Sequence, residues 1–186
     1  MQYWIELARQ SILNPRAAAP IVAGLILPPG TLALLVALVS VLNGIFYGLF
    51  LPAGLLPGLF GQPIPMAVLF GAIFVAGAAA LTGVGRLFGG TGEIRDILRV
   101  TIFLQIIRLA VQVVLIVIAL LVPVLATFLG TAAGVWGLYM MICFIAAAHR
   151  MDSRVKSFGV IGVTFFAAII ALSVLLSAMG LAPMEV

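Results

Sequence analysis

The chain has 186 residues, of which 65% are hydrophobic and 8% are charged, and its mean hydropathy is +1.38. This composition excludes a soluble globular domain and predicts one membrane domain over residues 1–186. The formal net charge of +4 is spread thinly, whereas a nucleic-acid-binding surface needs clustered basic residues. We therefore expect the lipid bilayer as partner and no nucleic acid.

Residues 1–29 are predicted to form interfacial helices rather than a membrane span. Trp4, Leu7 and Ile12 share one helical face, and polar side chains fill the opposite face. This pattern is typical of a helix lying in the headgroup layer with an aromatic anchor. The apolar run at 16–27 is shorter than the roughly 20 residues that a span requires.

Five later runs are long and apolar enough to cross a bilayer. The predicted fold class is therefore an all-α integral membrane protein, with five transmembrane helices preceded by interfacial amphipathic helices. The predicted spans are 31–51, 64–85, 109–128, 132–148 and 158–179.

Basic residues are distributed unequally between the two sides of these spans. The connections at 52–63 and 129–131 carry no charge, whereas eight basic residues fall on the other side. By the positive-inside rule, we expect a cytoplasmic N-terminus and an external, periplasmic C-terminus in a cell (inner) membrane. The eight are Arg9, Arg16, Arg86, Arg95, Arg99, Arg150, Arg154 and Lys156.

The stretch from Gly83 to Gln112 is predicted to be a glycine-rich loop that leads into an amphipathic helix. Thr91 is the expected N-cap, and Glu93 would then favour the helix dipole from the first turn. We expect this helix to lie in the headgroup layer before the third span begins. Pro123 is expected to bend that span.

Polar residues at membrane depth are the candidate contacts for lipid or ligand. Gln105, Arg108 and Gln112 fall on one helical face, which we call the polar stripe, and Asn43 is a possible partner on another span. Arg108 has two readings: it reaches anionic lipid headgroups by snorkelling, the favoured one, or it binds a ligand or ion. For His149, solvation at the interface is favoured over a proton relay.

Small residues spaced four apart predict close helix contacts. Ser40, Gly44 and Gly48 form one such face, and Gly130 and Gly134 repeat the spacing. Packing within the chain is the favoured explanation, and a homo-oligomer interface is the alternative.

No catalytic, cofactor-binding or metal-binding pattern is found in the sequence. The glycines at 83–92 are followed by no Lys-Ser/Thr pair and preceded by no strand. The single histidine excludes the common histidine-rich zinc sites. We expect a protein that is not an enzyme and has no cofactor.

Several short motifs, in this order, resemble the Yip1-domain family in its bacterial branch. They are Asn14-Pro15-Arg16, Gly89-Gly90-Thr91-Gly92 before an amphipathic segment, and Trp136 before a span that closes on His149-Arg150 and Ser153-Arg154-Val155-Lys156. The resemblance implies five membrane helices and, in eukaryotic relatives, contact with Rab GTPases in vesicle traffic. This sequence has neither their long N-terminal region nor their Asp-Leu-Tyr-Gly-Pro motif, so a Rab-type partner is not expected.

Two classes of function follow from these features. The first is a scaffold or membrane-organising protein with a trafficking-like role, which is favoured by the amphipathic surface segments. The second is a small transporter or channel, which is favoured by the polar stripe around Arg108.

Overall fold

A computed structural model describes residues 2–50 and 62–178, of which 88% are helical, with no strand among them. Residues 51–61, which hold the end of the first predicted span and most of the uncharged connection at 52–63, lie outside this range. Met179, the last residue of the fifth predicted span, also lies outside it. The described part contains seven helices: α1 (Gln2–Leu13), α2 (Pro15–Ala23), α3 (Pro29–Phe50), α4 (Pro63–Leu87), α5 (Ile94–Leu121), α6 (Pro123–Ala148) and α7 (Arg154–Ala178). Helices α3 to α7 are long and apolar enough to cross a membrane, in agreement with the predicted class.

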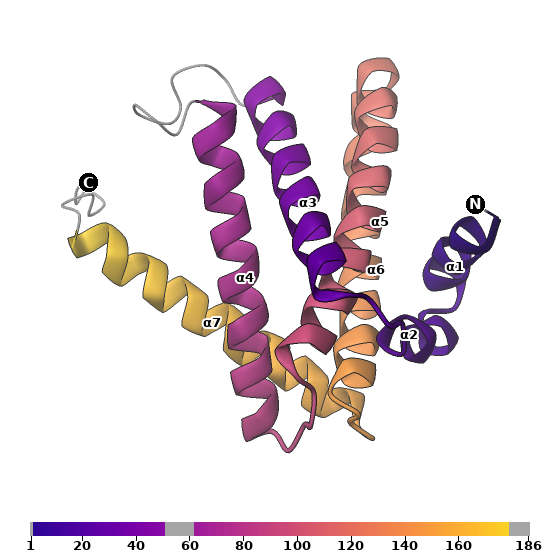
Figure 1. Cartoon of the computed structure of the whole chain (residues 1–186). Coiled ribbons are helices and arrows are strands. Elements are labelled where there is room, and N and C mark those ends of the chain that lie inside the picture. The colour runs from indigo at the N-terminus through magenta and orange to yellow at the C-terminus, as the bar shows by residue number, and fades with distance from the viewer. Residues whose placement is uncertain (1, 51–61, 179–186) are drawn as a thin grey trace.

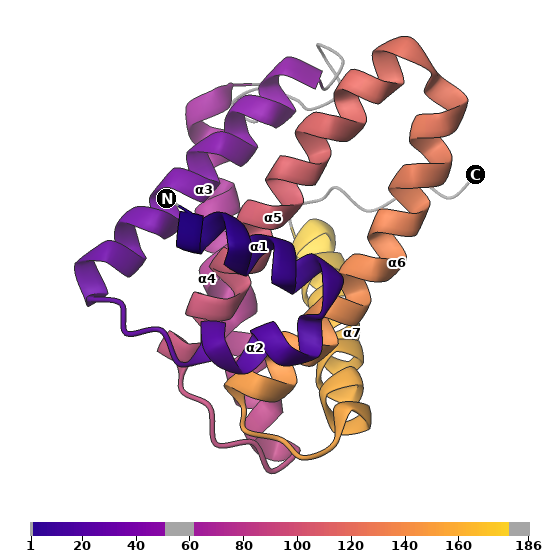
Figure 2. The ribbon, with the colours of Figure 1, turned by 90° about the vertical axis from the view of Figure 1, so that its right-hand side faces the viewer.

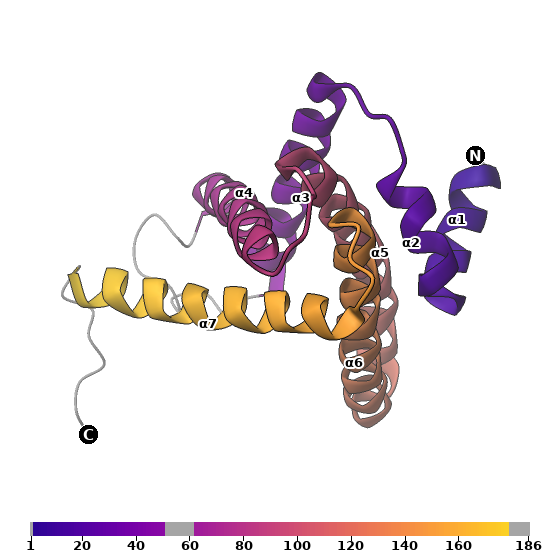
Figure 3. The same cartoon turned by 90° about the horizontal axis from the view of Figure 1, so that it is seen from below.

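The spanning helices form two antiparallel pairs and one outlying helix (Figure 1). Helices α3 and α4 make one pair, and α5 and α6 make the other. Helix α7 contacts α4 and α6 at their lower ends and then leaves the bundle at a steep angle (Figure 3). The short helix α2 lies against the α5–α6 pair, and α1 packs on α2 (Figures 2 and 3).

The boundary between α5 and α6 differs from the predicted turn at 129–131. Helix α5 ends at Leu121, and Pro123 is the first residue of α6. Proline favours the first helical position because its missing N–H would have no partner there and its φ is already helical. Pro123 therefore starts a helix instead of bending one.

Helix α5 also begins earlier than the predicted third span. Its N-cap is Glu93, not Thr91, and a capping box joins Glu93 to Asp96. From there one continuous helix of 28 residues runs to Leu121. Ile97 and Val100 are fully buried, so the first turns pack inside protein and are not a separate surface helix.

Small residues bring α3 and α4 together within the chain. A Cβ added at Gly44 would lie 2.9 Å from the Pro63 carbonyl oxygen and 3.0 Å from the Ala67 Cβ. At Gly71 it would lie 3.2 Å from Ser40 Oγ. In contrast, a Cβ at Gly134 would meet nothing within 4 Å, so the predicted close contact at Gly130 and Gly134 is absent from the described residues.

The largest buried core gathers at the end of the bundle where α4 and α6 finish. It joins α1 and α2 to the ends of α4, α5, α6 and α7, through residues such as Leu7, Ala19, Val100, Phe144 and Val160. Toward the α5–α6 turn, large apolar side chains such as Leu120 and Val124 are exposed. That exposure suits a surface covered by lipid.

Candidate functional site

The first polar cluster joins α3 to the middle of α5. Arg108 Nη2 donates to Asn43 Oδ1 at 2.6 Å, and Arg108 Nε donates to Gln105 Oε1 at 3.0 Å. Gln105 Nε2 donates to the same Asn43 oxygen at 3.2 Å. The Asn43 amide is buried and held in place, because its Nδ2 donates to the Val39 carbonyl at 2.7 Å.

Arg108 keeps unused hydrogen-bond capacity in this cluster. A guanidinium has five N–H donors, and the two bonds to Gln105 and Asn43 use two of them. The ion pairs of the described residues involve Arg9, Arg99 and Arg150, and none reaches Arg108.

Arg108 lies in the middle of α5. Leu121, the end of α5, lies thirteen positions further along the helix, which is about 20 Å at 1.5 Å per residue. If Leu121 marked the edge of a hydrocarbon core roughly 30 Å thick, Arg108 would lie about 10 Å inside the opposite edge. Its side chain turns toward Asn43 on the neighbouring helix.

Two hollows meet at Arg108. A cavity of about 170 Å³ is bordered by Ser40, Asn43, Phe70, Gln105 and Arg108. A larger groove of about 770 Å³ lies between α4, α5 and α6 and includes Arg108 and Gln112 in its wall. Gln112 therefore faces the groove one turn away and does not join the Asn43 cluster.

The second cluster surrounds His149, which is fully buried at the end of α6. Its Nε2 lies 3.1 Å from the Leu81 carbonyl oxygen of α4, so this nitrogen is the donor. Added Cβ atoms at Gly85, Gly90 and Gly92 would lie 2.1, 2.8 and 2.9 Å from the imidazole ring or its Cβ. The three glycines therefore form a cage that only residues without a side chain fit.

The glycine cage around His149 lies where α4 and α6 end. At the end of α4, Gly90 N donates to Gly85 O and Gly89 has φ +83°, which glycine adopts without strain. At the end of α6, Met151 N donates to Ala146 O and Arg150 has φ 54°. A non-glycine residue costs roughly 1–2 kcal/mol in that region.

Burial lowers the pKa of His149, and the Arg86 guanidinium acts in the same direction. The Leu81 carbonyl and Asp96 act against this shift. The neutral ring satisfies Nε2 on Leu81, whereas a charged ring would also bear a proton on Nδ1, which has no acceptor among the described residues. The expected solvation of His149 at the interface is therefore wrong.

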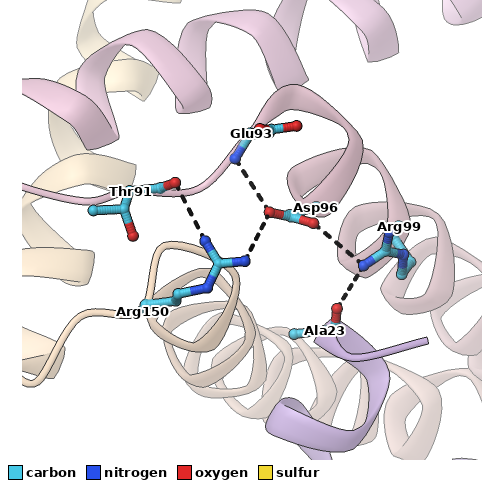
Figure 4. A network of polar contacts seen from close by, with 6 residues as sticks. All are labelled: Ala23, Thr91, Glu93, Asp96, Arg99 and Arg150. Carbon is cyan, nitrogen blue, oxygen red and sulfur yellow. Dashed lines mark hydrogen bonds and ion pairs between the residues drawn. The ribbon is translucent and has the colours of Figure 1, made fainter. Parts of the chain in front are cut away.

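The third cluster centres on the carboxylate of Asp96 (Figure 4). Arg99 Nη1 lies 3.3 Å from Asp96 Oδ1, and Arg150 Nη2 lies 3.6 Å from Oδ2. Arg99 also donates to the Ala23 carbonyl of α2, and Arg150 donates to the Thr91 carbonyl at 3.3 Å. One carboxylate thus joins the start of α5 to the end of α6 directly and, through Arg99, to the end of α2.

Residues 5–175 of the chain match the family model of the Yip1 domain. The chain belongs to the Yip1 domain family. Comparison with curated proteins and with solved structures gives no significant match. The Yip1 family is not a known enzyme family, and the described residues contain no group of three or more His, Cys, Asp or Glu placed to hold a metal ion.

This Yip1 domain distributes the predicted contact residues over three places. Asn43, Gln105 and Arg108 come together, Gln112 faces the adjoining groove, and His149 lies apart at the end of the bundle.

Sequence reasoning missed the connecting role of Asp96 and Arg150. The available signal was Asp96 three residues after Glu93, which is the spacing of a capping box. Nothing in the spacing indicated Arg150 as its partner, since 54 positions separate the two.

Proposed function

We propose that this Yip1 domain is a non-enzymatic, multi-pass scaffold that organises the membrane around it. The carrying observation is that the amphipathic helices α1 and α2 are fastened to the spanning α5–α6 pair while α1 presents apolar side chains outward. The expected position is a cell (inner) membrane with the N-terminus in the cytoplasm, and the expected partners are anionic lipid headgroups and further copies of the chain. A Rab-type GTPase is not part of the proposal.

Polar contacts from two helices, α5 and α6, hold α1 and α2 in place. Trp136 Nε1 donates to the Ile12 carbonyl at 2.8 Å, and Arg16 Nε donates to Tyr139 Oη at 2.7 Å. Arg99 of α5 donates to the Ala23 carbonyl. These bonds fix the two short helices on the bundle, so they would move with it as one body.

The outward side of α1 is suited to lipid. Tyr3, Trp4, Ile5 and Leu13 are 57%, 49%, 67% and 66% exposed. Aromatic rings prefer the boundary between headgroups and acyl chains, and helices of this type embed about 5–10 Å into it. A fixed helix inserted in one leaflet spreads that leaflet and favours curvature.

Vesicle shape tests this proposal. We expect the wild-type protein, reconstituted in phosphatidylcholine–phosphatidylglycerol vesicles, to narrow them relative to protein-free vesicles in electron cryomicroscopy. The double substitution Trp4→Ser with Ile5→Ser removes the wedge and should restore the larger diameter. Phe165→Ser with Phe166→Ser is the matched control, because both side chains are exposed on α7. Equal diameters for wild type and the Trp4/Ile5 variant would contradict the proposal.

A small transporter or channel is the second candidate, favoured by the polar cavity beside Arg108 and Asn43. In that case wild-type vesicles should release entrapped chloride or phosphate, and Arg108→Gln should slow the release. No release above protein-free vesicles would remove this candidate.

A further inference from the structure

The groove between α4, α5 and α6 combines an apolar wall with one cation. We infer that it holds an anionic lipid, whose phosphate or carboxylate head bonds Arg108 and whose acyl chain lies along the groove. This site is separate from the outward face of α1 on which the proposed function rests, since neither Trp4 nor Ile5 borders the groove.

The positive charge of Arg108 favours the binding of an anion at this position. Its guanidinium has donors left after the bonds to Gln105 and Asn43, and an uncompensated cation inside the hydrocarbon is costly. Because the Asn43 amide is buried and bonded to Val39, it fixes the direction of the guanidinium. Arg108 is therefore oriented before any ligand arrives.

The groove beside Arg108 favours the binding of an apolar hydrocarbon chain. Its wall includes Phe74, Leu104, Leu115 and Met141. Gly134 and Gly137 border it on α6, and a Cβ added at either would meet nothing within 4 Å. The described helices leave this space unfilled, and its volume of about 770 Å³ suits a flexible hydrocarbon chain.

A second copy of the chain fits the groove less well than a lipid. Its helices would bring apolar side chains but no negative charge to the depth of Arg108. Within residues 2–50 and 62–178, the acidic residues lie outside the five membrane helices or in the first turn of α5: Glu6, Glu93, Asp96 and Asp152. An anionic lipid supplies both the charge and the chain.

Binding to delipidated protein in a neutral detergent tests the inference. The probes are dioleoyl-phosphatidylglycerol, oleate, dioleoyl-phosphatidylcholine and inorganic phosphate, measured by native mass spectrometry and by the shift in melting temperature. We expect phosphatidylglycerol or oleate to bind and to raise the melting temperature of the protein. The stronger binder of the two shows whether the site prefers a phosphate or a carboxylate head group. Phosphatidylcholine and free phosphate should give little shift.

Two variants separate the head-group contact from the chain contact. Arg108→Gln removes the charge but keeps a polar side chain, and should weaken binding of the anionic probe about tenfold, or about 1.4 kcal/mol. Gly134→Leu fills the groove without touching Arg108 and should weaken the lipid in a similar way. Arg95→Gln is the matched control, because Arg95 is exposed near the start of α5.

Other results would overturn the inference. Equal binding of phosphatidylcholine, or no loss in Arg108→Gln, would exclude charge recognition at this site. An equal shift with free phosphate would indicate a simple anion site without a lipid chain. A change from dimer to monomer in Gly134→Leu, with unchanged lipid binding, would assign the groove to a second copy.

Discussion

At the scale of single residues, Asp96 has more polar partners than any other charged side chain in the described part of the chain. It caps α5 through Glu93, bonds Arg99, and pairs with Arg150 from the end of α6. The Asp96 and Arg99 side chains are only 16% and 15% exposed, so water screens their attraction weakly. Removing the carboxylate leaves Arg99 partly buried without its counter-charge.

We therefore expect Asp96→Asn to lower the free energy of unfolding by about 2–3 kcal/mol. Glu6→Gln is the control, because its pair with Arg9 is largely exposed and should contribute little to stability. Denaturation in a neutral detergent measures both. Equal losses in the two variants would show that the Asp96 contacts add nothing beyond a surface ion pair.

His149 gives the fold a dependence on pH. Its pKa is lowered in the folded protein, whereas the pKa of an unfolded histidine is about 6.5. As the pH falls below about 6.5, the unfolded state takes up the proton first, so stability falls until the lower folded pKa is reached. Above that window both states are neutral and this contribution to stability is complete.

The expected measurement is the melting temperature between about pH 7.5 and 5.5. Wild type should lose stability toward the acid end, and His149→Gln should be less stable at neutral pH but flatter across the window. The sequence has one histidine, so no second imidazole contributes. The same slope in both proteins would contradict a neutral, caged His149.

At the scale of elements, α1 has two faces with different surroundings. Leu7 is 3% exposed and belongs to the largest buried core, whereas Ile5 on the outward side is 67% exposed. The expectation that Trp4, Leu7 and Ile12 together enter the headgroup layer is therefore wrong for Leu7. Its side chain packs on protein.

Hydrogen exchange distinguishes the two faces of α1. Leu7→Asp should speed exchange across α1 and α2 both in detergent and in liposomes, because burying an unpaired carboxylate disrupts the protein core. Ile5→Asp should speed exchange in liposomes more than in detergent, because its expected contact is lipid. If Leu7→Asp acts in liposomes alone, α1 is held by lipid on both faces.

The number and type of the spanning helices could be predicted because apolar length is a local property of the sequence. The boundaries at Ile94 and Pro123 were harder, since buried apolar residues at the start of α5 resemble one face of a surface helix. His149 was misjudged because its cage comes from glycines more than 55 positions away. The Asn43 pairing with Arg108 was foreseeable only as a possibility, since nothing local sets which helices become neighbours.

At the scale of the whole molecule, the α4–α5 and α6–α7 connections lie at one end of the bundle and the α5–α6 turn lies at the other, with α1 and α2 beside the bundle between them (Figures 1 and 2). Described basic residues follow this division, as Arg95, Arg150 and Arg154 are near the first end. By the positive-inside rule, we expect that end to face the cytoplasm. Five crossings would then put Gln62 and Val122 on the outer side.

Labelling of single cysteines tests this arrangement most directly. In a Cys143→Ala background, Gln62→Cys, Val122→Cys, Arg95→Cys and Asp152→Cys are exposed to a membrane-impermeant maleimide in intact cells. We predict that Gln62→Cys and Val122→Cys react at once, and that Arg95→Cys and Asp152→Cys react only after permeabilisation. Reaction of Gln62→Cys and Arg95→Cys from the same side would contradict a crossing by α4 and, with it, the five-span fold.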